Sequence, residues 1–195
     1  MDYAYDLNRY QKYVFDSDKK TTNQEMLAFD DVLLVPQYSK VESRSSVDLS
    51  QNLNSNIKLN IPIISSPMDT VTEIEMACAM ADLGGLGIIH RYNTSEVQAA
   101  MVHNVTMKGA PNAAAAIGVT GEFKERASEL VRAGANILCL DVAHGHHVLM
   151  ERALKTLKDI YGKDVHLMAG NVATLEGFND LADWGADSVR CGIGG

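Results

Sequence analysis

Apolar and polar positions between residues 61 and 190 form blocks whose period changes regularly along the chain. Short runs that are apolar throughout, such as residues 137–140, are typical of strands buried on both faces. Between these runs, apolar residues recur every three or four positions, as in helices that pack one face against a sheet. The pattern therefore predicts alternating strands and amphipathic helices, with a repeat of about 25 residues.

Six strands and five helices are expected from this pattern. The strands cover residues 62–65, 86–90, 113–118, 137–141, 165–170 and 187–190. The helices cover about 72–83, 94–103, 123–134, 149–162 and 174–185. A capping box of Thr72 and Glu75 is expected to begin the first helix and Gly84 to end it, and Thr174 is expected to cap the last.

The first 28 residues are polar and rich in tyrosine, and we expect them to form an extension outside a main domain over 29–195. Apolar and aromatic residues at positions 3, 7, 10 and 14 predict a short amphipathic helix. A strand that ends in proline is expected at Leu27–Pro36. Asp30 and Asp31 within it are expected to serve a turn or capping role.

Strands that are apolar on both faces and alternate with helices form parallel sheets, so the fold class is α/β. A doubly wound sheet and a (β/α)8 TIM barrel both fit. Evenly sized units and the lack of Gly-x-Gly-x-x-Gly after the first strand favour the barrel. So do polar or glycine residues at the strand ends, which would meet at one mouth: Ser65-Ser66, His90, Gly118, Asp141, Asn171 and Arg190. We expect an incomplete barrel of six of its eight strands, which cannot close alone.

Composition narrows the class of protein. The 195 residues, 46% of them hydrophobic, suffice for one sizeable core. The net charge of −8 argues against nucleic acid as a partner. Cys78, Cys139 and Cys191 lack disulfide or zinc spacing, which favours a reducing, cytoplasmic location. No apolar run approaches the roughly 18 residues that span a bilayer, so no membrane association is expected.

Several residues near the expected strand ends can carry chemistry. Asp141 follows an apolar strand and either caps a helix or accepts hydrogen bonds from a cofactor. The run His144-Gly145-His146-His147 resembles a metal-binding cluster, although no further ligand at matching spacing completes it. A metal-dependent barrel hydrolase that uses His144 and His146 is therefore the alternative from another functional class.

The last residues combine a strand end with a glycine-rich loop. Gly192, Gly194 and Gly195 allow positive φ and close approach of a ligand to the backbone, as in loops that hold an anion or a cofactor. Arg190 can pair with phosphate or carboxylate, or balance Asp187. Cys191 is a nucleophile in one interpretation, but a small core residue is the interpretation that we favour.

Five ordered motifs resemble the IMP dehydrogenase / GMP reductase family: Phe29–Pro36, Ser65–Glu73, Gly84–His90, Gly170–Thr174 and Gly192–Gly194. This resemblance implies a barrel enzyme, a homotetramer when complete, that acts on a purine nucleotide. In the dehydrogenases a cysteine thiolate attacks IMP, hydride passes to NAD, and water releases XMP. The reductases convert GMP to IMP with NADPH.

The resemblance also implies roles for individual residues. Substrate-binding positions are Ser66, Met68 and Asn171, and Asn171 and Arg190 also support catalysis. Cofactor-binding positions are Asp141, Val142, Ala143, Gly192, Ile193 and Gly194, and the Gly194 carbonyl matches a potassium ligand. The nucleophilic cysteine would follow Gly195. We therefore expect an N-terminal portion that is inactive without a complementary C-terminal part, and both an interrupted gene and a shortened polypeptide fit that expectation.

Two local features bear on the choice within the family. About ten residues, Asn104–Ala113, separate the second helix from the third strand, so the CBS modules that most dehydrogenases insert there are expected to be absent, as in reductases. Val142-Ala143 is similar to reductases, whereas Ser66-Pro67-Met68-Asp69 and His144-Gly145-His146 are similar to dehydrogenases. An NAD-dependent IMP dehydrogenase without CBS modules is the leading hypothesis, and GMP reductase is the alternative.

Overall fold

The computed structural model describes residues 29–192, so the amphipathic helix expected between residues 3 and 14 lies outside the described part. The described residues belong to two compact units, divided between Tyr38 and Ser39. Each unit is considered by itself.

Residues 29–38 contain a single turn of 3-10 helix, Phe29–Asp31, followed by backbone without regular structure. The strand predicted at Leu27–Pro36 is therefore wrong for its described residues. Leu33 and Leu34 are 95% and 97% exposed, and no described strand pairs with this segment. An apolar run becomes a strand only where another backbone satisfies its N–H and C=O groups.

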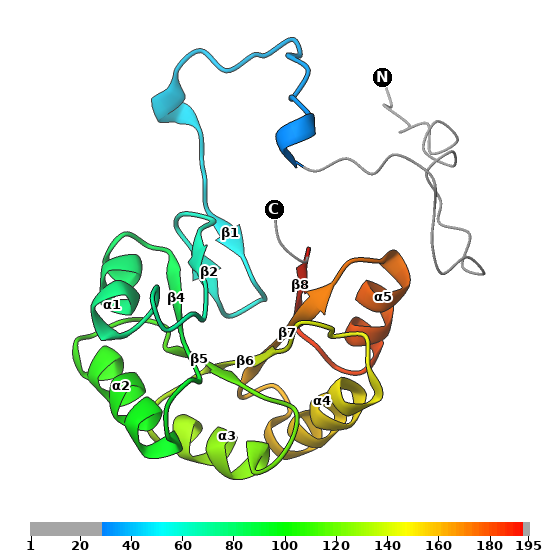
Figure 1. Ribbon diagram of the computed structural model, residues 1–195. Helices are drawn as coiled ribbons and strands as arrows, with labels where there is room; N and C mark the ends of the chain where they lie inside the picture. The colour runs from blue at the N-terminus through cyan, green and yellow to red at the C-terminus, as the bar shows by residue number, and fades with distance from the viewer. Residues whose placement is uncertain (1–28, 193–195) are drawn as a thin grey trace. The chain divides into compact units, whose positions relative to one another are not determined.

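The second unit is built on six parallel strands whose order in the sheet is their order along the chain. They are β3 (Ile64–Ser65), β4 (Leu86–Ile89), β5 (Ala114–Ile117), β6 (Ile137–Asp141), β7 (His166–Val172) and β8 (Ser188–Cys191). The sheet curls, and the helices lie on its outer side (Figure 1). The prediction of an incomplete (β/α)8 barrel is confirmed.

Five helices connect consecutive strands: α1 (Ile74–Asp82), α2 (Ser95–Met107), α3 (Phe123–Arg132), α4 (Val148–Tyr161) and α5 (Leu175–Asp183). Residues 108–113 alone join α2 to β5. Thr174 caps α5 as predicted, because its Oγ1 accepts a hydrogen bond from the Gly177 N–H at 3.0 Å. Gly84 follows α1 with a φ of 82°, a conformation that suits glycine at a helix end.

The capping box predicted for Thr72 and Glu75 is wrong. The residue that precedes α1 is Glu73, and its side chain makes no capping hydrogen bond. The Thr72 hydroxyl instead donates to the carbonyl of Ser66, 2.6 Å away. The Thr72 hydroxyl therefore bonds to the Ser66 carbonyl in the loop after β3, and not to the backbone at the start of α1 as the pattern predicted.

The buried side chains of the sheet form two layers, because successive residues of a strand point to opposite faces. In β5, Ala115 and Ile117 join the outer layer beneath the helices, whereas Ala114 and Ala116 face the barrel interior. The interior layer also contains residues of the neighbouring strands: Leu86, Ile88, Ile137, Cys139 and Met168. Burial on both faces explains why these strands are uniformly apolar.

An antiparallel hairpin that the pattern did not predict covers part of this interior. Its strands are β1 (Gln51–Asn52) and β2 (Lys58–Leu59), and Ile57 and Leu59 pack against the interior layer. The Asn54 amide lies 2.8 Å from His166 Nδ1, and His166 Nε2 lies 2.8 Å from Ser188 Oγ. Since His166 and Ser188 begin their strands, the hairpin is attached at the amino end of the sheet.

Candidate active site

The carboxyl ends of β6, β7 and β8 meet in one row of the sheet. Asp141 is in register with Gly170, and Gly170 is in register with Arg190. Asn171 follows directly in β7. The structure thus brings together Asp141, Asn171 and Arg190, as predicted from their positions at strand ends.

Arg190 and Asp141 form an ion pair across this row, in which Arg190 Nη1 donates to Asp141 Oδ1. Their side chains are 25% and 18% exposed, so the pair is partly shielded from solvent. Burial by itself would lower the pKa of Arg190, but the adjacent Cys139 and Asp141 raise it overall, and the guanidinium stays cationic. Asp141 is therefore held by an arginine and does not cap α4, whose N-cap is His147.

Cys139 lies beneath this ion pair, with its Sγ 3.7 Å from Arg190 Nη1. The side chain is fully buried, and burial raises the pKa of the thiol to about 12. Cys139 is consequently a neutral thiol near neutral pH and belongs to the interior layer.

Asn171, near the end of β7, bonds to two loops at the mouth. Its Nδ2 donates to the carbonyl of Gly192 at 2.7 Å, and its backbone N–H donates to the carbonyl of Val142 at 2.8 Å. Its own carbonyl accepts a hydrogen bond from the Gly145 N–H at 2.7 Å. The peptide bond between Gly170 and Asn171 is cis. The loops after β6 and β8 are thereby both attached to the end of β7.

Gly145 makes the approach of the β6 loop to β7 possible. A Cβ at this position would lie 2.8 Å from the carbonyl oxygen of Asn171 and 3.0 Å from the carbonyl carbon of Gly170. Both neighbours are backbone atoms, so no side-chain rotation relieves the overlap. Any larger residue at position 145 must push the loop after β6 away from the end of β7.

The histidines around Gly145 serve separate structural roles. His146 Nε2 lies 2.7 Å from Asp180 Oδ2 in α5, and His147 Nδ1 accepts from the Leu149 N–H at the start of α4. Within residues 29–192, no group of three or more His, Cys, Asp or Glu side chains is arranged to hold a metal ion. His146, a metal ligand in the hydrolase alternative, is instead paired with Asp180 in this structure.

The loop after β3 contributes the other side of the site. Ser66 and Arg190 line a cavity of about 200 Å³, together with residues of the interior layer and the loop: Leu53, Ile64, Ser65, Pro67, Ile88, Met168, Ser188 and Val189. Met68 does not line this cavity and is 50% exposed. Of the predicted substrate-binding residues, Ser66 therefore lies at the site and Met68 lies beside it.

The remaining predicted residues have mixed outcomes. Val142 and Gly192 belong to the Asn171 network, whereas Ala143 is exposed. Cys191 is exposed at the end of β8, so its interpretation as a core residue is wrong. Ile193 and Gly194 lie outside the described residues.

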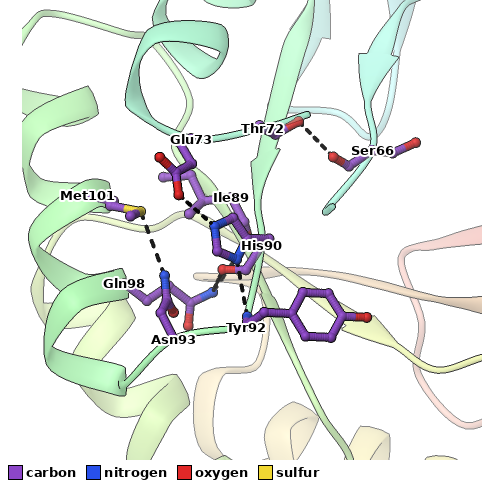
Figure 2. Close-up of polar contacts among 9 residues, drawn as sticks. All are labelled: Ser66, Thr72, Glu73, Ile89, His90, Tyr92, Asn93, Gln98 and Met101. Carbon is purple, nitrogen blue, oxygen red and sulfur yellow. Dashed lines mark hydrogen bonds and ion pairs between the residues drawn. The ribbon is translucent and has the colours of Figure 1, made fainter. Parts of the chain in front are cut away.

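A polar cluster at the end of β4 was largely missed from sequence (Figure 2). His90, 3% exposed, has its Nε2 3.0 Å from Glu73 Oε1. Gln98 of α2 is completely buried, and its Nε2 donates to the carbonyls of His90 at 2.9 Å and Ala116 at 2.7 Å. Arg126 Nη1 donates to Gln98 Oε1 at 2.8 Å. The cluster therefore joins β4 and β5 to α2 and α3.

One signal in the sequence could have identified Gln98. It lies four and seven residues before Val102 and Val105, which are the buried residues of α2. A polar residue in line with a buried apolar face requires hydrogen-bonding partners. The pattern did not say which backbone carbonyls those partners would be.

Within the described residues, no helix is both long enough and apolar enough to cross a bilayer.

The chain is similar in sequence to known proteins. A family model of the IMP dehydrogenase / GMP reductase domain matches residues 26–195. The inosine-5'-monophosphate dehydrogenase of Cryptosporidium parvum is 39% identical over 210 residues, which cover 86% of this chain and 51% of that protein. That of Borreliella burgdorferi is 36% identical, covering 88% of this chain and 54% of the relative.

A GMP reductase of Leishmania major is 28% identical over 89% of this chain and 62% of the relative. The chain thus spans between 51% and 62% of the length of these curated relatives. The family model covers almost all of it. On this match, the chain belongs to the IMP dehydrogenase / GMP reductase family.

Proposed function

We propose that this chain supplies the first six strands of an IMP dehydrogenase, which oxidises IMP to XMP with NAD. The observation that carries the proposal is the network of Asp141, Arg190, Asn171 and Gly192 at the mouth of a barrel that belongs to this family. Relatives named inosine-5'-monophosphate dehydrogenase support the choice of reaction.

The proposal assigns a task to each part of the site. Ser66 and Met68 bind the nucleotide, and Ser66 lines the cavity that Arg190 also lines. Arg190 offers a fixed cation, and the Asn171 amide orients the loop at Gly192. A nucleophilic cysteine beyond Gly195 forms the bond to the purine in this scheme.

The cofactor side of the site has room for a ligand beside its backbone. A Cβ built on Gly192 would meet no atom of residues 29–192 within 4 Å, so the loop can be approached closely there. Asp141, Val142, Ala143 and the loop from Gly192 to Gly194 are the residues that we propose to hold NAD, which supplies the hydride acceptor when bound. The proposed potassium ligand is the carbonyl of Gly194, and no step is assigned to the ion.

GMP reductase is the second candidate. Val142-Ala143 and the short connection between α2 and β5 favour it, and a relative carries that name. Ser66-Pro67-Met68-Asp69 and the sequence around Gly145 favour the dehydrogenase. Both reactions pass hydride between a nicotinamide and a purine, so one site geometry suits either direction.

The proposal includes a partner for the sheet. In the order from β3 to β8, each end strand pairs on one side only among the described residues, and unpaired strand edges associate with further backbone. We propose that a complementary C-terminal part supplies the last two strands of the eight-stranded barrel. We further propose that the complete protein is a cytoplasmic homotetramer, and that this chain alone does not turn over substrate.

The test compares two substrate pairs on one preparation of this chain together with the C-terminal part. IMP with NAD is expected to form XMP and NADH, measured by NADH absorbance and by chromatography of the nucleotides. Conversion of GMP to IMP with NADPH, without oxidation of IMP, would establish the reductase instead. The chain on its own is the control, and turnover by it would contradict the requirement for the complementary part.

A further inference from the structure

Thr72 is a completely buried polar residue that makes contacts in three directions. Figure 2 shows its bond to Ser66. Its Oγ1 donates to the carbonyl of Ser66 at 2.6 Å and lies 2.9 Å from Ser65 Oγ. Its backbone N–H donates to the carbonyl of Met68 at 3.0 Å. Its own carbonyl accepts from the His90 N–H at 3.4 Å. Thr72 therefore attaches the loop after β3 to the end of β4.

The loop that Thr72 holds has few other restraints. Ser66 and Met68 are exposed, and Met68 N–H bonds back to the Ser66 carbonyl within the loop itself. Among the side-chain hydrogen bonds of residues 29–192, that of the Thr72 hydroxyl is the one that reaches residues 66–68. The Thr72 hydroxyl thus adds a side-chain restraint at Ser66 to the backbone bonds that Val71 and Thr72 make to the Met68 carbonyl.

Glu73, which follows Thr72, is bonded to His90 and so helps to hold Thr72 in place. The Tyr92 N–H donates to His90 Nδ1 at 3.1 Å, so the proton of the neutral ring is on Nε2. Nε2 then donates to Glu73 Oε1 at 3.0 Å. This bond attaches the start of α1 to the end of β4. Thr72 therefore lies between two attachments, its own bond to the Ser66 carbonyl and the bond from Glu73 to His90.

We propose that Thr72 is a positioning residue for nucleotide binding, which sets the Ser66–Met68 loop in its binding conformation before the nucleotide arrives. The inference rests on the proposed function, because it takes Ser66 and Met68 as nucleotide contacts. A loop that is already ordered loses less conformational entropy on binding, so affinity rises without any contact between Thr72 and the ligand.

Two substitutions separate positioning from packing. Thr72→Val keeps the branched shape and removes the donor, whereas Thr72→Ser keeps the donor and removes a methyl group. We expect Thr72→Val to raise the Kd for IMP roughly five- to tenfold, as for the loss of one hydrogen bond. The kcat at saturating IMP should change by less than about twofold, because the loop is ordered in the bound ground state and in the transition state alike, so its ordering cost cancels between them. Thr72→Ser should bind IMP like the wild type.

A matched control removes a similar hydroxyl elsewhere. Thr156 in α4 donates to the carbonyl of Arg152 at 2.7 Å, and Thr156→Val should leave the Kd unchanged. If Thr72→Val does not fold, Thr72→Cys is measured instead. Its thiol is a weaker hydrogen-bond donor than the hydroxyl, so Thr72→Cys should also raise the Kd for IMP. All variants are measured in the protein with its complementary part, by calorimetric titration with IMP and by steady-state kinetics.

The outcomes distinguish the inference from the function on which it rests. Wild-type protein that does not bind IMP would overturn the proposed function and the inference together. Wild-type protein that binds IMP, with equal affinity in Thr72→Val, would overturn the inference alone. So would a Thr72→Ser variant that binds as weakly as Thr72→Val, because packing would then explain both.

Discussion

Replacing Gln98 by methionine tests how much the buried amide at the end of β4 stabilises the fold. Methionine has a similar length and no hydrogen-bonding amide. The substitution removes the donor to the carbonyls of His90 and Ala116 and the acceptor of Arg126. The third carbonyl nearby, that of Ile89 at 3.4 Å, is too distant to add much.

The magnitude follows from these three bonds. Each neutral bond contributes about 1 kcal/mol net, and the bond from the charged guanidinium about 2 kcal/mol. Burial of the thioether offsets part of the loss, and Arg126 keeps its bond to the Asn93 carbonyl at 2.9 Å. We therefore expect Gln98→Met to lower the free energy of unfolding by about 3 kcal/mol.

Urea unfolding followed by circular dichroism measures this difference, from midpoints compared at equal slope. Asn104 is the control within α2, since its amide also donates to a backbone carbonyl, that of Ala100 at 2.8 Å, but from an exposed position. Asn104→Leu should change stability by no more than about 0.5 kcal/mol. A Gln98→Met protein as stable as the Asn104→Leu protein would refute the argument from burial.

Two further predictions concern the mouth and the hairpin. Gly145→Ala should reduce kcat/KM by roughly tenfold to a hundredfold, because the added Cβ overlaps the Asn171 backbone and displaces the loops by about 1 Å. The control in the same assay is Gly118→Ala, whose Cβ would meet only Arg91 Nη1 at 3.7 Å. Burial, aided by nearby Lys158, lowers the pKa of His166 in the folded state. The contribution of His166 to stability is therefore complete above about pH 6.5, the unfolded value, and is lost as pH falls from there through the folded pKa. Urea midpoints between about pH 7 and about pH 5 should fall less steeply in His166→Gln than in wild type, and equal slopes would contradict the assignment.

The strands and helices could be predicted wherever burial imposed a simple period. The strand 137–141 was predicted to the residue, because four consecutive apolar side chains are buried between two layers. The convergence of Asp141, Asn171 and Arg190 also followed, since parallel strands place their carboxyl ends at one edge. These predictions needed only local periodicity and the direction of the chain.

Other features depended on partners distant in sequence. The hairpin between residues 51 and 59 has strands of two residues each, and it is stabilised by Asn54, which reaches His166. Thr72 has a capping spacing, yet its hydroxyl bonds to the Ser66 carbonyl. The spacing of residues shows which hydrogen bonds a side chain can form. Which of the possible partners it bonds to depends on how segments distant in sequence pack together.

The sequential order of the strands has a consequence for how the molecule forms. From β3 to β8, strands that are neighbours in the sheet are also consecutive along the chain. A nascent polypeptide can therefore add each strand and its helix to an edge that already exists, while later residues are still being synthesised. Contacts between neighbours along the chain close short loops, which favours rapid assembly over a search among distant segments. The pairing of β8 with β7, which brings Arg190 of β8 within reach of Asp141 of β6, is then among the last of these pairings to form. The site is therefore completed only after the strands and helices that support it.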